Sequence, residues 1–495
     1  MLTLLIERRI REWADIAGLL PSSQNGFRTG YRTHNNSFVL RTAIEWARAH
    51  HCSLYVAFVD LTNAFPSVDQ PTLWLKLAQC GIQGPLIDWL RMLYDRMQYM
   101  VRHEGEWSQP FQAHAGILTG DPASPILWDL YFADVVIRDH DADVILNGRR
   151  ISHLEQADDV ALFSTSPGAV QRKLDDLFSW CGVNFMVMHR TKTCGMVFGP
   201  IPRPLPTLYV DSTALRWVPE YPYIGVIFSS TTPDIFRTHL HTCARRARQL
   251  AYGCYSVEGY IGALPAWVAR TLYTARVDPH LTLACEVIPD VVRSELAPLE
   301  DVQHMYLRRL LGLNSRSCLA PLFTETGLLP LRYRRAQLTL QYLSYVLSAP
   351  HTIAFDALQE SHALLSAGHS SWLSDLWHAL HNLPVHVPLN IEGRITKEAV
   401  EAAMQQIQLA VDSHLSSTIA YSPRLHLLRD RVELNRNGKK VPGVMAFRQY
   451  LRILPADLAQ GIARLLAGDH PFAIEQGPPA RYARTEGAAA LSLLS

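Results

Sequence analysis

The sequence predicts an α+β protein in which a mixed region of about 230 residues precedes an almost purely helical one. Up to residue 230, strand-like runs alternate with helix-like runs, and from residue 235 apolar residues recur at helical spacing. The chain has 495 residues, of which 48% are hydrophobic and 18% charged. This composition allows large buried cores and excludes wholesale disorder.

The mixed region divides into short elements that can be assigned in order. Residues 53–59 are aromatic and β-branched, which predicts a buried strand. Helical spacing predicts helices over 70–98, with a break near 81–85, and over 167–183. A hairpin is expected over 98–115, a helix over 122–139, paired strands over 150–164, and single strands over 193–198 and 222–229.

The helical region begins near residue 236. Residues 237–252, 262–284, 295–312 and 331–349 have apolar residues at i, i+3 and i+4, and shorter helical stretches alternate with loops beyond 350. We therefore expect divisions at 1–235, 236–349 and 350–495. No run approaches the roughly 18 apolar residues of a membrane helix, and charges follow the first five apolar residues too early for a signal peptide.

Acidic residues stand where strands of the mixed region end or turn. Asp60 directly follows the strand at 53–59, and Asp158 and Asp159 occupy the turn between two short strands. Carboxylates brought together from distant segments can hold two divalent cations for in-line phosphoryl transfer, and their hard oxygens suit Mg²⁺. An Asp-Asp pair alone is weak evidence, because Asp175 and Asp176 form another pair in a helical context.

Six short motifs occur in one order along the mixed region. They are QNGFRTG at 24–30, FVDLTNAF at 58–65, GILTGDPASP at 116–125, QADD at 156–159, Trp180 with Lys192-Thr193, and YPYIG at 221–225. In this order they resemble the signature before motif A, and motifs A to E, of reverse transcriptases. The resemblance is to the non-LTR, LINE-like retrotransposon class and covers about residues 1–345.

The resemblance implies a right-hand polymerase with partial fingers, a ferredoxin-like palm, an α-helical thumb and a helical C-terminal region. The implied reaction is RNA-templated addition of deoxynucleoside triphosphates to the 3′ end of a DNA primer, in the nucleus and without a membrane. Nothing in the sequence indicates a protein partner. Because only 23 residues precede Gln24, the fingers are expected to be incomplete, and an endonuclease domain and a Cys-rich module are expected to be absent.

Roles follow position by position from the resemblance. Asp60, Asp158 and Asp159 would bind two Mg²⁺ ions, for which Mn²⁺ is a possible substitute, and Lys192 would protonate the pyrophosphate leaving group. Phe65 would be the steric gate against a 2′-hydroxyl. The remaining nucleotide contacts would come from the amides of Leu61 to Ala64, from Thr119 and Gly120, and from Arg28.

Several motif positions depart from the family pattern. Thr119 stands where Gln is usual, Gln156 where Tyr or Phe is usual, His189 where Asn is usual, and Pro66 where Asp is frequent. None of these changes removes a carboxylate of the expected metal site.

The formal net charge of +1 argues against a simple polybasic nucleic-acid binder. The arginines are nevertheless concentrated: residues 237–276 and 302–337 each carry six against a single acidic residue. Arg245, Arg246, Arg248, Arg308 and Arg309 are therefore expected to contact phosphates of an RNA–DNA hybrid, the alternative being that they cap helices or pair with acids.

Two other functions stay open at this level. One is a catalytically inactive relic that still binds RNA or RNA–DNA hybrid, and the other is a folded remnant that acts at most as a scaffold. The intact aspartates favour an enzyme, whereas incomplete fingers favour a relic.

Overall fold

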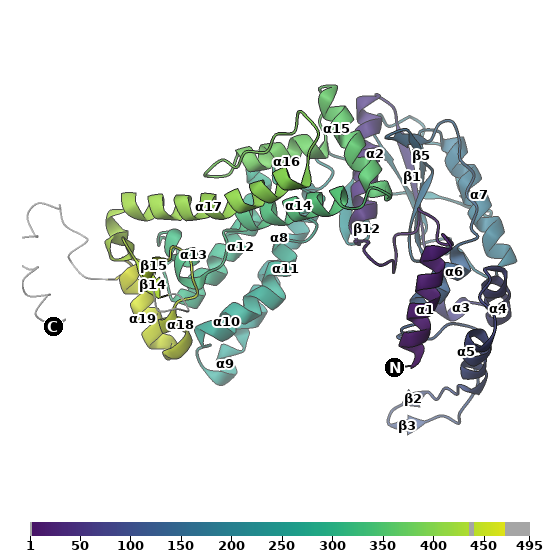
Figure 1. Ribbon diagram of the computed structural model, residues 1–495, viewed down its shortest axis with the longest axis horizontal. Helices are drawn as coiled ribbons and strands as arrows, with labels where there is room; N and C mark the ends of the chain where they lie inside the picture. The colour runs from purple at the N-terminus through teal and green to yellow at the C-terminus, as the bar shows by residue number, and fades with distance from the viewer. Residues whose placement is uncertain (1, 435–439, 471–495) are drawn as a thin grey trace, which may run out of the picture. The chain divides into compact units, whose positions relative to one another are not determined.

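The computed structural model describes residues 2–434 and 440–470 and is drawn in Figure 1. The chain separates into two compact units. The first comprises Met1–Phe236 and Tyr345–Ser374, and the second comprises Arg237–Ser344 and Asp375–Ser495. The segment 345–374 is therefore packed with the mixed region, although it follows the first helices of the other unit.

A five-stranded mixed sheet lies at the centre of the first unit. Its order is β11-β8-β1-β7-β6, with β11 parallel to β8 and all other pairs antiparallel. Every residue of the central strand β1 is buried, as expected for an apolar run with neighbours on both sides. The strands are β1 (Leu54–Val59), β6 (His153–Gln156), β7 (Asp159–Ser164), β8 (Cys194–Phe198) and β11 (Arg216–Trp217).

Alternate residues of β1 face opposite layers, because side chains along a strand alternate between the two faces of a sheet. Tyr55, Ala57 and Val59 join the main core with residues of five helices: α1 (Leu2–Ile16), α4 (Gln70–Gln79), α5 (Pro85–Arg96), α6 (Ser124–Phe132) and α7 (Pro167–Val183). On the other face, the ring of Phe58 stacks on Tyr221, with centroids 4.2 Å apart.

The first unit also contains further helices and short strands. They are α1 (Leu2–Ile16), α2 (Asn35–Ala49), α3 (Ala64–Ser67), α4 (Gln70–Gln79), α5 (Pro85–Arg96), β2 (Arg102–His103), β3 (Glu106–Trp107), α6 (Ser124–Phe132), β4 (Val144–Leu146), β5 (Arg149–Ile151), α7 (Pro167–Val183), β9 (Tyr209–Val210), β10 (Thr213–Ala214), β12 (Glu220–Tyr223), β13 (Val226–Ser229) and α15 (Ile353–Ser366).

Two predicted elements of this unit were wrong in extent. Residues 222–229 are not one strand, because Ile224 and Gly225 have positive φ values of 48° and 80° and turn the chain into the hairpin β12–β13. The helix expected over 122–139 ends at Phe132. Beyond it, Asp134 accepts hydrogen bonds from Lys76 at 2.7 Å and Trp180 at 2.8 Å, and these tertiary contacts outweigh helix propensity.

The second unit is mainly helical. Its elements are α8 (Arg237–Ser256), α9 (Glu258–Ile261), α10 (Ala266–Leu272), the π-helix η1 (Tyr273–Val277), α11 (Asp278–Leu281), α12 (Arg293–Leu311), α13 (Ala320–Thr326), α14 (Leu331–Leu347, ending in the first unit), α16 (Trp372–His381, beginning in it), α17 (Lys397–Tyr421), the 3₁₀ helix η2 (Pro423–Leu428), β14 (Val432–Leu434), β15 (Lys440–Pro442), α18 (Gln449–Ile453) and α19 (Ala456–Leu466). No helix in the described ranges is long and apolar enough to span a membrane.

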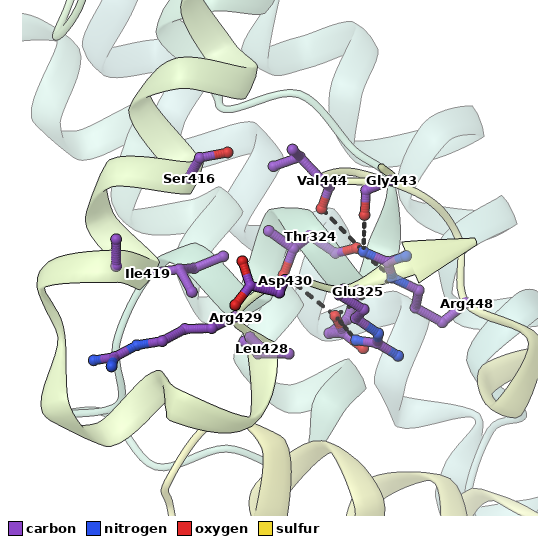
Figure 2. A pocket seen from close by; sticks show the side chains of 12 residues that line it. Thr324, Glu325, Ser416, Ile419, Leu428, Arg429, Asp430, Gly443, Val444 and Arg448 are labelled. Carbon is purple, nitrogen blue, oxygen red and sulfur yellow. Dashed lines mark hydrogen bonds and ion pairs between the residues drawn. The ribbon is translucent and has the colours of Figure 1, made fainter. Parts of the chain in front are cut away.

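A buried ion cluster attaches the end of the described chain to α13. The carboxylate of Glu325 is fully buried and accepts hydrogen bonds from Arg431 at 2.7 Å and from the Tyr450 hydroxyl at 3.0 Å. Arg448 lies 3.5 Å from the same carboxylate and donates to the carbonyl of Thr324 at 3.0 Å. Glu325, Arg431 and Arg448 line a pocket of about 530 Å³ together with residues of α13 and α17. Figure 2 shows Glu325 and Arg448 in this lining.

Candidate active site

The pairing of β1 with β7 brings two of the predicted carboxylates to the same edge of the sheet. Val59 is registered with Val160, so one residue further out Asp60 stands opposite Asp159. Asp158 lies in the tight turn between β6 and β7, where Gln156 is registered with Asp159. The turn requires a positive φ of 58° at Ala157. Three aspartates that are distant in sequence therefore share one end of the sheet.

The pKa values of Asp158 and Asp159 are raised by their surroundings. Asp158 is half-buried and Asp159 reaches solvent. The protein atoms around Asp159, and then the charges of Asp158 and Asp60, raise the pKa of its carboxyl to about 6. Desolvation raises the pKa of Asp158 as well, with a further contribution from Asp60. Like charges held together in this way are stabilised by a cation.

The donor set fits a divalent cation in its chemistry, since carboxylate oxygens are the ligands that Mg²⁺ and Mn²⁺ take. Within 2–434 and 440–470, however, no group of three or more acidic, histidine or cysteine side chains is arranged to hold a metal ion. Asp60 instead has a positively charged side chain close to its carboxylate.

That side chain belongs to Lys192, whose Nζ lies 3.6 Å from Oδ2 of Asp60. The loop that carries Lys192 runs along the segment after β1. The amide of His189 donates to the carbonyl of Asp60 at 2.8 Å, and the amide of Asp60 donates to the hydroxyl of Thr193 at 3.3 Å. The Lys192 side chain remains 64% exposed. The ammonium group thus lies beside the Asp60 carboxylate and remains accessible to a ligand.

The loop before α2 is hydrogen-bonded to the tight turn between β6 and β7 that carries Asp158, which we call the aspartate turn. Oε1 of Gln24 accepts hydrogen bonds from the amides of Gly26 at 2.7 Å and Ala157 at 2.9 Å. A Cβ atom on Gly26 would lie 2.3 Å from the amide nitrogen of Ala157, so this approach requires glycine. The loop at 24–30 therefore positions the turn that carries Asp158.

The segment after β1 is fastened to the loop before α6. The amide of Ile117 donates to the carbonyl of Phe65 at 2.9 Å, and the amide of Gly116 donates to that of Val68 at 2.7 Å. Phe65 is half-buried, and its ring stacks on Trp128 with centroids 5.4 Å apart. Thr119 and Gly120 lie on the exposed part of the same loop, and Gly120 has open space beside it at a φ of 92°.

One of the backbone amides expected to contact the nucleotide already donates a hydrogen bond within the chain. The amide of Thr62 donates to the carbonyl of Val187 at 2.8 Å, so it is not available to a triphosphate. Ala64 is buried and begins the four-residue helix α3, after Asn63 in a left-handed conformation.

Comparison with known proteins concerns the chain's N-terminal region. Residues 2–228 match the family described as reverse transcriptase (RNA-dependent DNA polymerase). This region belongs to the reverse transcriptase family. It is related to the enzymes of non-LTR retrotransposons.

The retrovirus-related Pol polyprotein of the type-2 retrotransposable element R2DM of Drosophila melanogaster is 24% identical, over 42% of this chain and 21% of that protein. The RNA-directed DNA polymerase from mobile element jockey of Drosophila funebris is 24% identical, over 63% of this chain and 34% of that protein. The chain thus spans between a fifth and about a third of these relatives. A solved apo telomerase structure from Candida tropicalis aligns over 86% of this chain and 60% of that chain at 10% identity, with a TM-score of 0.34, a likeness too weak to indicate the fold.

Within this reverse transcriptase region, Arg28 is engaged locally. Its Nη1 donates to the carbonyl of Pro21 at 3.1 Å, and its guanidinium lies 4.4 Å from the ring centroid of Tyr31. Its Nε is buried and has no hydrogen-bond partner among the described residues. The Nη1 group and the face of the Arg28 guanidinium therefore already have partners within the chain.

The five arginines predicted to hold nucleic acid fall into two groups in the second unit. Arg245, Arg246 and Arg248 are exposed along α8. By contrast, Arg309 pairs with Glu258 at 2.7 Å and lies over the ring of Tyr255, and Arg308 is half-buried with a donor to the carbonyl of Ser317 at 3.4 Å. The alternative of local pairing thus applies to Arg309, and Arg308 is also held within the fold.

Sequence reasoning missed Asp129 of the reverse transcriptase region. This residue on α6 is 1% exposed, and neither carboxylate oxygen has a hydrogen-bond partner in the part of the chain that the structure describes. Burial raises its pKa to about 8, against the opposing effect of Arg11 and Arg28. An Asp inside an apolar helical run, between Trp128 and Leu130, was the available signal.

Proposed function

We propose that the chain is an RNA-directed DNA polymerase of a LINE-like retroelement, which adds deoxynucleotides to a DNA 3′ end on an RNA template. The observation that carries the proposal is the meeting of Asp60, Asp158 and Asp159 at one edge of the sheet, inside a region of the reverse transcriptase family. The proposal includes a right-hand architecture, with partial fingers and the palm within 1–235 and an α-helical thumb and connection over 236–349. The helical C-terminal region over 350–495 has no role in it.

The aspartates would hold two divalent cations, Mg²⁺ or Mn²⁺, which when bound stabilise charge on the attacking and leaving oxygens. Lys192 lies beside Asp60 and would donate a proton to the departing pyrophosphate. Phe65 would face the sugar of the incoming nucleotide, and the exposed Thr119 and Gly120 would lie along its base pair.

RNA template and DNA primer would be gripped through their phosphates. Arg245, Arg246 and Arg248 extend from one exposed side of α8, and guanidinium groups suit phosphate oxygens better than ammonium groups do. By the same likeness, synthesis would take place in the nucleus.

Primer extension on poly(rA)–oligo(dT) with Mg²⁺ or Mn²⁺ tests the proposal. We expect extension by the wild-type chain and none by Asp158→Ala. Asp95→Ala, which changes an exposed carboxylate of α5, is the matched control and should extend like wild type. Absence of extension by the wild type, or equal extension by Asp158→Ala, would overturn the proposal. Salt-sensitive hybrid binding without extension would then support an inactive relic.

A further inference from the structure

Phe27 has an unusual backbone in the loop that is fastened to the aspartate turn. Its φ is +55°, a left-handed conformation that non-glycine residues rarely adopt and that is concentrated at functional sites. Nη1 of Arg11 donates to its carbonyl at 2.6 Å, and Glu7 in turn holds Arg11 through an i, i+4 ion pair. Helix α1 therefore fixes a strained residue whose side chain is 44% exposed.

The ring of Phe27 meets Phe65 at an interplanar angle of 77°, with centroids 6.0 Å apart. Phe65 also stacks on Trp128, with centroids 5.4 Å apart and planes 13° apart. Trp128 is fully buried and is itself stacked on Phe132 at 5.5 Å. Phe65 thus has one rigid aromatic neighbour from the core and one exposed aromatic neighbour from the loop at 24–30.

The backbone of Phe65 is held independently of these rings. Its carbonyl accepts the amide of Ile117 at 2.9 Å, and Gly116 approaches so closely that a Cβ there would lie 2.9 Å from the carbonyl oxygen of Pro66. The freedom left to Phe65 is therefore rotation of its side chain, and the contacts with Phe27 and Trp128 restrict that rotation.

We propose that Phe27 is a positioning residue for nucleotide selection: it holds the ring of Phe65 where that ring excludes a 2′-hydroxyl. This inference rests on the proposed function, since it assigns a second residue to the same sugar-selecting surface. Because Phe27 is nearly half exposed, it contributes little to the core, and its strained backbone places its ring against Phe65 rather than in the interior.

The test is the ratio of kcat/KM for dATP over ATP, opposite a template uridine on an RNA–DNA primer–template. For Phe27→Ala we expect this ratio to fall about three- to tenfold, the range that loss of one aromatic pair gives. Phe27→Leu keeps apolar volume without the ring and should show a similar fall. Phe178→Ala, which removes a 39% exposed phenylalanine of α7, should leave the ratio unchanged.

A double mutant separates positioning from general damage. If Phe27 acts through Phe65, Phe27→Ala added to Phe65→Ala should lower the ratio no further than Phe65→Ala alone. A ratio in both Phe27 variants that matches wild type, or full additivity in the double mutant, would overturn the inference while leaving the polymerase proposal intact. A wild-type chain that extends no primer would instead overturn the proposed function, and this inference with it.

Discussion

Gln24 and Ala157 are joined by a hydrogen bond of 2.9 Å across 133 residues of sequence. The side-chain oxygen of Gln24 accepts the amide at the turn that presents Asp158, and the same oxygen accepts the amide of Gly26. The loop at 24–30 and the turn that carries Asp158 are therefore held together by hydrogen bonds. A substitution in the loop should thus displace the carboxylate of Asp158 even though the substituted residue does not contact it.

Gly26→Ala is the sharpest such change. Its new methyl group would overlap the backbone at Ala157, so we expect a loss of about 1–3 kcal/mol in the free energy of unfolding. Displacement of Asp158 should lower kcat/KM for primer extension by more than about tenfold.

Gly182→Ala is the matched control, because at this exposed glycine of α7 a new methyl group would have no atom of the described chain within 4 Å beyond its own helix backbone and neighbours. Replacing a helical glycine by alanine should raise stability by about 0.5–1 kcal/mol and leave extension unchanged. Urea denaturation measures both variants. Equal stability of Gly26→Ala and wild type would contradict the close approach of Gly26 to Ala157.

Lys192→Met should lower kcat by about a hundredfold if the ammonium group donates the proton to pyrophosphate. Stability should barely change, because an exposed ion pair such as that with Asp60 contributes at most about 1 kcal/mol. Steady-state extension kinetics with a thermal melt test this, with the exposed Lys397→Met of α17 as control. A kcat close to that of wild type would exclude Lys192 as the acid.

Asp129 should make stability depend on pH. Burial raises the pKa of Asp129 to about 8 in the folded chain, whereas an unfolded aspartate titrates near 3.9. Between these values the unfolded chain has released the proton and the folded chain has kept it. Stability should therefore fall as pH rises from about 4 to 8, by up to about 1.4 kcal/mol per pH unit, and level off above pH 8.

Asp129→Asn removes this titration and should flatten the fall between pH 5 and 8, with a gain in stability at the alkaline end. Urea midpoints at several pH values measure the difference, and Asp95→Asn, at an exposed site, should keep the wild-type slope. An identical pH slope in Asp129→Asn and wild type would show that Asp129 is ionised in the folded chain. Such a result would require a partner for its carboxylate.

The three exposed arginines of α8 should account for salt-sensitive binding of an RNA–DNA hybrid. Replacing Arg245, Arg246 and Arg248 by Ala should reduce the slope of log K against log salt by about 0.9 for each phosphate that these side chains neutralise. Titration of a labelled hybrid at several salt concentrations measures the slope. A triple variant at the exposed Arg394, Lys397 and Arg424 carries the same charge change and should keep it. Equal slopes in the two triple variants would show that the arginines of α8 do not bind the phosphates of the hybrid.

Much of the fold could be predicted because local patterns were strong. The apolar, β-branched run at 53–59 predicted β1, and helical spacing at 167–183 predicted α7 with its observed bounds. The hairpin at 220–229 was missed because Ile224, a strand-forming residue by propensity, adopts a positive φ that only its context imposes. Helix α6 was predicted too long because the contacts that end it come from Lys76 and Trp180.

For the candidate site, the sequence by itself determined the residue types and their order: Asp60 after a strand, Asp158 and Asp159 in a turn, and the motifs around them. Only the tertiary structure decided that Lys192 lies beside Asp60, that Phe27 contacts Phe65, and that Arg309 is paired with Glu258. The physical reason is that a local pattern records backbone preference and burial, both of which depend on neighbours in sequence. The partner of a charge or an aromatic ring depends on which distant segments the sheet and helices bring together.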